Sequence, residues 1–470
     1  MTSINRELVS QIRKYYCDAG QGHVFTWWDD LSSEERELLF KQLTNVDLEL
    51  MNRLAETNLT QKTDKEARVL EPAPIIRLAR TTEEKAIREK ARAVGQEVIK
   101  RGKCAAFVVA GSGNPTLDHE RVKGKFPITP VTGKSLFQLH TEKVLGLRRR
   151  YDVNIPLFVM TSQDNHDETR SFFEQHGYFG MSGEDIFFFA QGMLPVVDLS
   201  GKLLMQNRGS LFMSPDGHGG SIRSLHNSGA IEEMESRGID YIFYFQVDNA
   251  LTQILDPVFV GYHHMEKAEI SSKVVQKRSP EERVGVVGKI NGCPSVVEYS
   301  DLSKEDMYAR DENGQLKFLL GNIAIHMLNV SFVRRLSTGN FKLNFRKTMK
   351  SIDCIDEKGE AIQATGHNAI KFESYVFDAL QYTNETICLE VAREEEFSPF
   401  KSLKGEDSPE VCRLMLSNFY RTWIERAGFQ CENGDNPDIE ISPLFALDAE
   451  EFCFKIKQKN KLLSRKLFIE

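Results

Sequence analysis

An apolar run that opens directly into a glycine-rich loop constrains the fold of this chain more than any other feature. Residues 104–110 read Cys-Ala-Ala-Phe-Val-Val-Ala, and the loop that follows contains Gly111 and Gly113. A strand buried on both faces of a parallel sheet needs such a run. Glycines at its end leave backbone amides open to an anion, although many glycine-rich turns merely connect a strand to a helix. Because Lys123 beyond the loop can neutralise phosphate oxygens, the segment points to a nucleotide.

Strand-like and helix-like runs alternate between residues 102 and 403, which predicts an α/β fold with a central, doubly wound, Rossmann-like sheet. We expect strands over 105–110, 155–161, 186–190 and 241–247, and helices over 135–149, 167–176 and 230–237. The two strand-like runs on either side of Asn291-Gly292 predict a β-hairpin that carries Glu298 and makes the sheet mixed. Ligands of such sheets bind beyond the carboxyl ends of the strands.

The sequence predicts three consecutive domains. Residues 1–100 have apolar positions at helical spacing and form an accessory helical domain, in which Ser32 and Glu35 make a capping box. The sheet domain that would carry any catalysis covers 101–403. A small C-terminal α+β domain covers 404–470, with a helix over 409–427 and short strands near Ile439 and Phe452.

Charge and composition exclude several classes of protein. The formal net charge of −8 argues against a general nucleic-acid or anionic-membrane binder, which would normally be basic. No apolar run is long enough to span a bilayer, and the N-terminus lacks the apolar core of a secretion signal. We therefore expect a cytoplasmic protein without a nucleic-acid or membrane partner.

Three polar positions follow strand-like runs where ligands are expected. Asp248 ends the run 241–247 with a carboxylate, and Mg²⁺ binds one or two carboxylates together with phosphate oxygens. The alternative is an aspartate that caps the next helix. The Gln191 amide can read a nucleobase edge or be a satisfied loop amide. Gly217 lies in a second glycine-rich loop, which suits close approach by a base or ribose but is also typical of a surface turn.

Several ordered motifs resemble the UDP-N-acetylhexosamine pyrophosphorylases, members of the UDP-sugar pyrophosphorylase family. The motifs are FFFAQGMLP, MSPDGHGG, QVDN, VGVV followed by VVEYS, LGNIAIH, and AIKFESYVFDAL leading to EEEFSPFK. The resemblance implies a nucleotidyltransferase core that forms UDP-N-acetylglucosamine and pyrophosphate from UTP and N-acetylglucosamine 1-phosphate with Mg²⁺. The LGNIAIH motif is similar to the acetylhexosamine branch rather than the UDP-glucose branch.

The resemblance also implies roles for individual residues. Those expected to bind the nucleotide are Ala110, Gly111, Gln191, Gly217 and Lys371, with Asp248 as the Mg²⁺ ligand. Those expected to act on the phosphates are Lys123 and Lys401. Those expected to bind the sugar substrate are His218, Asn249, Glu298 and Asn322, where His218 replaces the family's usual asparagine.

One loop departs from the family pattern. The family has an arginine after the first glycines, where this chain has Pro115 or Thr116, depending on which neighbours are matched. Losing such a contact typically costs about a hundredfold in rate, unless Arg121 or Lys125 compensates. The alternatives are therefore a catalytically impaired nucleotide-sugar-binding homologue, or an enzyme that uses another sugar 1-phosphate.

Overall fold

A computed structural model describes residues 5–60, 69–111, 122–339, 343–356, 358–429, 438–459 and 467–470. The chain folds as two compact units that interleave along the sequence. Unit 1 consists of Met1–Arg68, Gly192–Ser221 and Leu343–Val376, and unit 2 consists of Val69–Gln191, Ile222–Lys342 and Phe377–Glu470. The three consecutive domains expected from the sequence stay a prediction.

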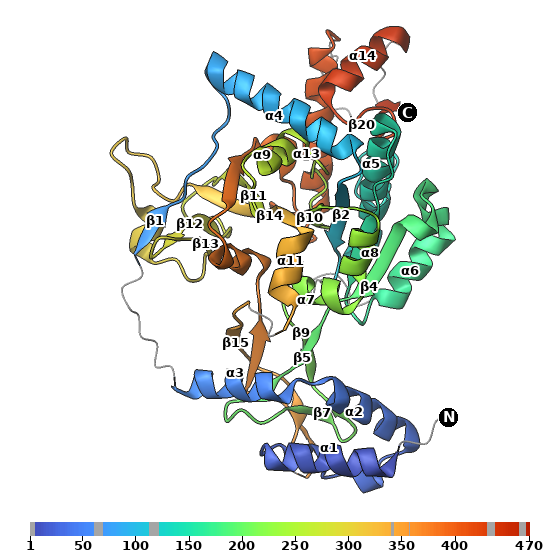
Figure 1. The fold of residues 1–470 in the computed structure, drawn as a ribbon, viewed down its shortest axis with the longest axis vertical. Helices are drawn as coiled ribbons and strands as arrows, with labels where there is room; N and C mark the ends of the chain where they lie inside the picture. The colour runs from blue at the N-terminus through green and yellow to red at the C-terminus, as the bar shows by residue number, and fades with distance from the viewer. Residues whose placement is uncertain are drawn as a thin grey trace. The chain divides into compact units, whose positions relative to one another are not determined.

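Unit 1 combines three helices with short strands (Figure 1). Its main elements are α1 (Arg6–Asp18), α2 (Ser33–Asn45), α3 (Leu48–Thr60), β5 (Met193–Pro195), β6 (Val197–Asp198), β7 (Met205–Asn207), β8 (Ser210–Leu211), β9 (Met213–Pro215), β15 (Arg346–Lys350), β16 (Cys354–Ile355), β17 (Ala361–Ile362) and β18 (Ala369–Glu373). The predicted capping box of Ser32 and Glu35 begins α2. Tyr16, Leu39 and Phe372 meet in the core of this unit, so the N-terminal helices pack on strands from much later in the chain.

Unit 2 contains the central sheet. Its strands are β1 (Leu70–Pro72), β2 (Cys104–Val109), β3 (Leu157–Thr161), β4 (Ile186–Ala190), β10 (Tyr241–Gln246), β11 (Ile270–Gln276), β12 (Val286–Ile290), β13 (Cys293–Val297), β14 (Leu320–Asn329) and β19 (Thr386–Glu390). The strands lie in the order β1-β12-β14-β10-β2-β3-β4, with β11 joining β14 to β19 and β13 paired to β12. Because β10, β2, β3 and β4 are parallel and β14 is antiparallel to β10, the predicted mixed α/β sheet is confirmed.

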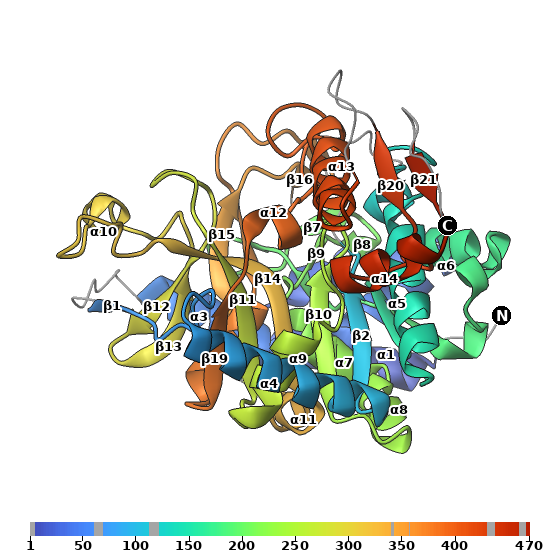
Figure 2. The same ribbon diagram turned by 90° about the horizontal axis from the view of Figure 1, so that it is seen from above.

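Unit 2 also contains helices, and several of them flank the sheet (Figure 2). They are α4 (Thr82–Lys100), α5 (Leu136–Tyr151), α6 (His166–Gln175), α8 (Ala230–Ser236), α9 (Pro257–Met265), α10 (Lys304–Tyr308), α11 (Val330–Ser337), α12 (Arg393–Glu396), α13 (Pro409–Arg426) and α14 (Ala449–Lys459), and α7 (Gly220–Asn227) begins in unit 1. Glycines allow α4 and α9 to touch: a Cβ on Gly261 would lie 1.7 Å from the Ala91 carbonyl oxygen. No helix in the described part of the chain is long and apolar enough to cross a membrane.

The predicted elements are confirmed with shifts of at most two residues at their ends, and one is wrong. All six residues of β2 are buried, as its apolar run requires. The hairpin of β12 and β13 turns at Asn291 and Gly292, whose φ angles of 51° and 83° suit a primed turn. Phe452 is not in a strand but in α14, where it shares a buried face with Ile456 four residues later. The strand near Ile439 exists as β20 (Ile439–Ile441), which pairs with β21 (Leu467–Ile469).

Candidate functional site

The loops after three parallel strands of unit 2 meet where the nucleotide was expected. Ala110 follows β2, and its carbonyl oxygen accepts a hydrogen bond from the Asn165 amide at 3.1 Å. Gln191 follows β4 and is 7% exposed. A Cβ on Gly111 would lie 2.8 Å from the Gln191 side-chain oxygen. The structure therefore brings Ala110, Gly111 and Gln191 together, and the missing side chain of Gly111 makes the close approach possible.

A lysine and an aspartate form the charged centre of this edge. The Lys123 ammonium donates a hydrogen bond to the Asp248 carboxylate, with 3.1 Å between Nζ and Oδ2. Both side chains are largely buried, with exposed fractions of 9% and 18%. The turn that carries Lys123 is held by close packing, because a Cβ on Gly124 would lie 2.2 Å from the Phe137 ring.

The segment that carries Lys401 pairs with the segment that carries Asp248. The Phe400 amide donates to the Asp248 carbonyl oxygen at 2.9 Å, and Asn249 forms a β-bridge with Pro399. The Asn249 side chain completes this joint, since its amide nitrogen donates to the Glu396 carbonyl oxygen and its oxygen accepts from the Ser398 amide. Asn249 is 2% exposed, and both of these side-chain hydrogen bonds are to the protein backbone. Its predicted contact with the sugar stays a prediction.

A second carboxylate lies beside Lys401. Asp407 Oδ2 is 3.9 Å from Lys401 Nζ, and the Lys401 backbone amide donates a hydrogen bond to the Asp407 carbonyl oxygen at 3.0 Å. Burial raises the pKa of Asp407 above its usual value, and the nearby charge of Asp248 acts in the same direction. The sequence analysis missed Asp407 because it lies in an irregular polar loop without a strand or a motif to mark it.

Two predicted sugar-binding residues approach the same glycine, Gly285, which directly precedes β12. The Asn322 backbone amide donates to the Gly285 carbonyl oxygen at 2.8 Å. Glu298 follows β13, and its Oε1 would lie 3.3 Å from a Cβ on Gly285. The hairpin, whose strand β12 pairs with β14, thus brings Glu298 near Asn322 of β14. These two residues are 24 positions apart in the sequence.

Unit 1 carries a cluster of its own. The Gly217 loop lies on the end of β18, where a Cβ on Gly217 would be 2.3 Å from the Ser374 carbonyl oxygen. His218 Nδ1 accepts a hydrogen bond from the Val376 amide at 3.2 Å. Lys371 lies on β18 itself, 3.9 Å from the Glu373 carboxylate. Within this unit the structure therefore brings Gly217 and His218 to the strand that carries Lys371.

His218 is held in its neutral form. Burial lowers the pKa of His218 to about 4, and the charge of Arg346 acts in the same direction. Because Nδ1 accepts a hydrogen bond, the proton of the neutral ring is on Nε2. The His218 ring therefore has its one N–H at Nε2 and carries no charge near neutral pH.

The described residues fit a metal ion that takes few protein ligands. Among them no group of three or more His, Cys, Asp or Glu side chains is arranged to hold a metal. Asp248 supplies one carboxylate at the sheet edge, which suits Mg²⁺ because this ion keeps waters and binds substrate phosphates. Pro115, Thr116 and Arg121 lie outside the described residues. Lys125 forms an ion pair with Glu168.

Comparisons with known proteins agree along nearly the whole chain. The sequence profile of the family described as UTP–glucose-1-phosphate uridylyltransferase matches residues 48–465. A probable UDP-N-acetylglucosamine pyrophosphorylase of Dictyostelium discoideum is 32% identical over 96% of both chains. The UDP-N-acetylglucosamine pyrophosphorylase of Saccharomyces cerevisiae is 32% identical over 91% of this chain and 93% of its own. The crystal structure of the Trypanosoma brucei enzyme of that name superposes with a TM-score of 0.83 at 26% identity, covering 100% of this chain and 99% of that one.

Proposed function

Because this chain belongs to the UTP–glucose-1-phosphate uridylyltransferase family, we propose that it makes UDP-N-acetylglucosamine and pyrophosphate from UTP and N-acetylglucosamine 1-phosphate. The observation that carries this conclusion is the 32% identity to a probable UDP-N-acetylglucosamine pyrophosphorylase over 96% of both chains. The mixed sheet with its loops at the carboxyl ends of parallel strands is an architecture that binds nucleotides at this edge.

The reaction requires no nucleophile from the protein. A phosphate oxygen of the sugar 1-phosphate attacks the α-phosphorus of UTP and forms the new P–O bond. The bond from the α-phosphorus to the oxygen that bridges to the β-phosphate breaks, and pyrophosphate leaves with that electron pair. The protein contributes orientation and stabilisation of charge, which supply most of the rate in transfers of this kind.

We assign the phosphates to the edge formed by Lys123, Asp248 and Lys401. When bound at Asp248, Mg²⁺ would neutralise charge on the phosphate oxygens. Lys123 holds the Asp248 carboxylate in place and adds a positive charge to this edge. The Lys401 side chain is 49% exposed and lies beside a partly buried Asp407, which suits a group that meets the incoming sugar phosphate.

The remaining predicted residues are assigned to the uridine and the sugar. Gln191 and Gly111 supply an amide and an open backbone for the base, with Ala110 beside them. Glu298 and Asn322 offer one side-chain carboxylate and one side-chain amide for sugar hydroxyls and the acetamido group. From unit 1 we assign Gly217 and Lys371 to UTP and His218 to the substrate, as a neutral donor. These roles, the Mg²⁺ requirement and the cytoplasmic location are proposals.

A panel of sugar 1-phosphates tests the function. Pyrophosphate release is measured with UTP and Mg²⁺ and with N-acetylglucosamine, N-acetylgalactosamine or glucose 1-phosphate. We expect the highest kcat/KM with N-acetylglucosamine 1-phosphate. UTP binding without pyrophosphate release from any of the three sugars would contradict the proposal and favour the impaired homologue.

A further inference from the structure

Unit 2 buries an ammonium between two carboxylates, and none of these three side chains is assigned a role above. Lys273 lies on β11 and is 0% exposed. Its Nζ is 2.9 Å from Glu396 Oε2 and 3.1 Å from Asp256 Oδ2. The Phe259 ring of α9 lies over the same ammonium, with 5.5 Å between Nζ and the ring centroid. This ion cluster of Lys273, Asp256 and Glu396 therefore joins three segments in the protein interior.

The two carboxylates of the ion cluster belong to the two segments that pair at the edge of the sheet. Asp256 lies eight residues after Asp248, at the end of the loop that follows β10. Glu396 ends α12 and lies five residues before Lys401. Because Lys273 pairs with both carboxylates, it links the segment of the proposed metal ligand to the segment of the proposed sugar-phosphate contact.

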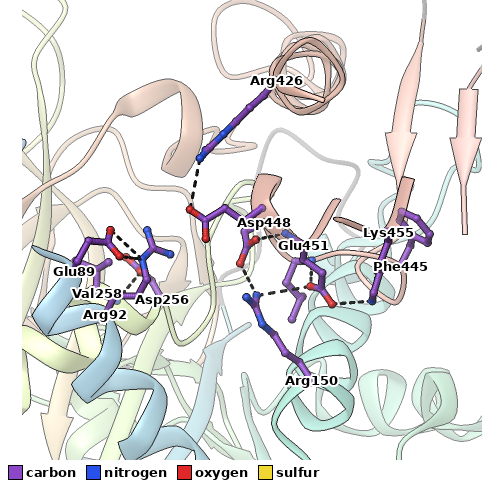
Figure 3. A network of polar contacts seen from close by, with 12 residues as sticks. Glu89, Arg92, Arg150, Asp256, Val258, Arg426, Phe445, Asp448, Glu451 and Lys455 are labelled. Atoms are coloured by element: carbon purple, nitrogen blue, oxygen red, sulfur yellow. Dashed lines mark hydrogen bonds and ion pairs between the residues drawn. The ribbon is translucent and has the colours of Figure 1, made fainter. Parts of the chain in front are cut away.

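The second oxygen of each carboxylate accepts a hydrogen bond from the backbone. Asp256 Oδ1 accepts from the Val258 amide at 2.9 Å and so caps the start of α9 (Figure 3). Glu396 Oε1 accepts from the Gln253 amide at 2.9 Å. The Glu396 carbonyl oxygen also accepts from the Asn249 side chain, at 2.8 Å. Glu396 is thus bound to the loop after β10 both by its side chain and by its backbone.

Two further cations act on the ion cluster from neighbouring helices. The Lys143 ammonium of α5 donates to two carbonyl oxygens of the loop after β10, at 2.7 and 2.9 Å, and interacts with Glu396 through its charge. Arg88 of α4 acts on Asp256 through its charge. The excess negative charge of two carboxylates against one ammonium is therefore compensated from α4 and α5.

Stability alone does not account for an ion cluster at this place. Burial raises the pKa of Glu396 to about 7, because the charged carboxylate has lost its water. Buried ion pairs are often no more stabilising than well-packed apolar side chains of similar volume. What charges add is a defined geometry, since one ammonium draws both carboxylates to the same point.

We propose, on the basis of the proposed function, that Lys273, Asp256 and Glu396 are positioning residues of the transferase. They hold the segment of Lys401 in register with the segment of Asp248, so that the sugar phosphate approaches the α-phosphate of UTP in line. The three residues act through Asp248 and Lys401 and not on the substrates themselves.

Lys273→Met tests the link, at about pH 8, where the Glu396 carboxylate is charged. The variant leaves two facing acids without their ammonium, so we expect a lower Tm. In the pyrophosphate-release assay, KM for N-acetylglucosamine 1-phosphate rises about tenfold and kcat falls. The Kd of UTP, measured by calorimetry without Mg²⁺, stays within about twofold because the proposed uridine contacts follow other strands, β2 and β4.

The double variant Lys273→Met, Glu396→Gln separates positioning from stability. It removes both charges with little change in volume, so most of the lost Tm returns. The KM for the sugar 1-phosphate stays about tenfold above the wild-type value because the ionic link is still missing. Recovery of KM together with the Tm overturns the proposal, and so do wild-type KM and kcat in Lys273→Met.

Asp185→Asn is the matched control. Asp185 reverses the charges of the ion cluster, because this acid lies 2.7 Å from Arg148 and 3.0 Å from Arg237. It is 9% exposed and directly precedes β4, whereas the site lies beyond the carboxyl ends of the strands. We expect Asp185→Asn to lower the Tm and to keep the wild-type KM and kcat.

Amide hydrogen exchange of the full chain tests the link without an activity assay. The Ser398 and Phe400 amides donate to the segment that begins at Asp248. Peptides that cover 397–401 exchange about tenfold faster in Lys273→Met and at the wild-type rate in Asp185→Asn. Wild-type exchange in Lys273→Met overturns the proposal. A wild-type chain that releases no pyrophosphate contradicts the proposed function instead, and the exchange rates still measure the link.

Discussion

Lys123 and Asp248 are 125 residues apart in the sequence, and the ammonium of the first donates to the carboxylate of the second across 3.1 Å. A second pair of the same kind lies at the other end of these strands. Lys103 directly precedes β2 and Asp240 directly precedes β10, with 3.3 Å between the charged atoms. That second pair is more exposed, at 39% and 56%. The same two strands therefore provide a site pair and a matched surface pair.

Asp248→Asn tests the metal assignment. We expect pyrophosphate release with UTP, Mg²⁺ and N-acetylglucosamine 1-phosphate to fall about a hundredfold or more, because an amide is a poor Mg²⁺ ligand and transition-state charge loses its counter-ion. Asp240→Asn, which removes the surface pair, keeps full turnover. Steady-state kinetics checks both variants, and wild-type turnover in Asp248→Asn would remove the metal assignment.

Lys401→Met tests the sugar-phosphate contact. Loss of the ammonium raises KM for the sugar 1-phosphate about tenfold or more and lowers kcat, because the removed group pairs with an anion. Asp407→Asn has a smaller effect in the same direction, since this carboxylate acts through Lys401. An unchanged KM in Lys401→Met, measured at saturating UTP, argues against the assignment.

Gly124→Ala tests how the Lys123 turn is held. The new methyl group overlaps the Phe137 ring, which lies 2.2 Å from the Cβ position, so we expect a lower Tm and a displaced Lys123 with reduced kcat. Gly366→Ala is the control, because no atom lies within 4 Å of its Cβ position. Phe137→Leu in the Gly124→Ala background restores part of both losses. If it restores neither, contact with the ring is not the cause.

The buried His263 predicts a loss of stability in acid. His263 is 0% exposed, and burial lowers its pKa to about 4. An unfolded histidine binds its proton near pH 6.5, so the unfolded state gains protons first as the pH falls from 6.5 to 4. The unfolding free energy of the wild type then drops by about 3 kcal/mol relative to that of His263→Asn.

Urea unfolding of both proteins at several pH values measures this difference. The exposed His176→Asn serves as the control, for which we expect no comparable change relative to the wild type. A difference between wild type and His263→Asn that stays constant from pH 7 to pH 4 contradicts the prediction.

Local patterns in the sequence predicted β2, β3, β4 and β10 of the sheet, left α9 and α11 unpredicted, and placed a strand where α14 lies. The continuous apolar run of β2 and the Asn291-Gly292 turn are signals contained within a few residues, so they could be recognised directly. The strand predicted near Phe452 was wrong because a short apolar stretch does not distinguish a strand from one face of a helix. Only the packing of α14 decides between them.

The site was harder to predict because its parts come from distant segments. No periodic pattern marks the bridge between Asn249 and Pro399, or the contact of the Gly217 loop with Ser374. Both are tertiary contacts whose partners cannot be identified from local sequence. The family motifs supplied candidate residues, but Asp407 lies outside them and was found only from its place beside Lys401.

The bridge between Asn249 and Pro399 also sets an order of events during synthesis. A chain still attached to the ribosome can hold Lys123 and Asp248 long before the stretch with Lys401 has been translated. At about 5–20 residues per second, the 153 residues from Asp248 to Lys401 take roughly 8 to 30 s to add. With the role proposed for Lys401, the nascent polypeptide is inactive for that whole interval, and transfer chemistry begins only once translation has passed this lysine.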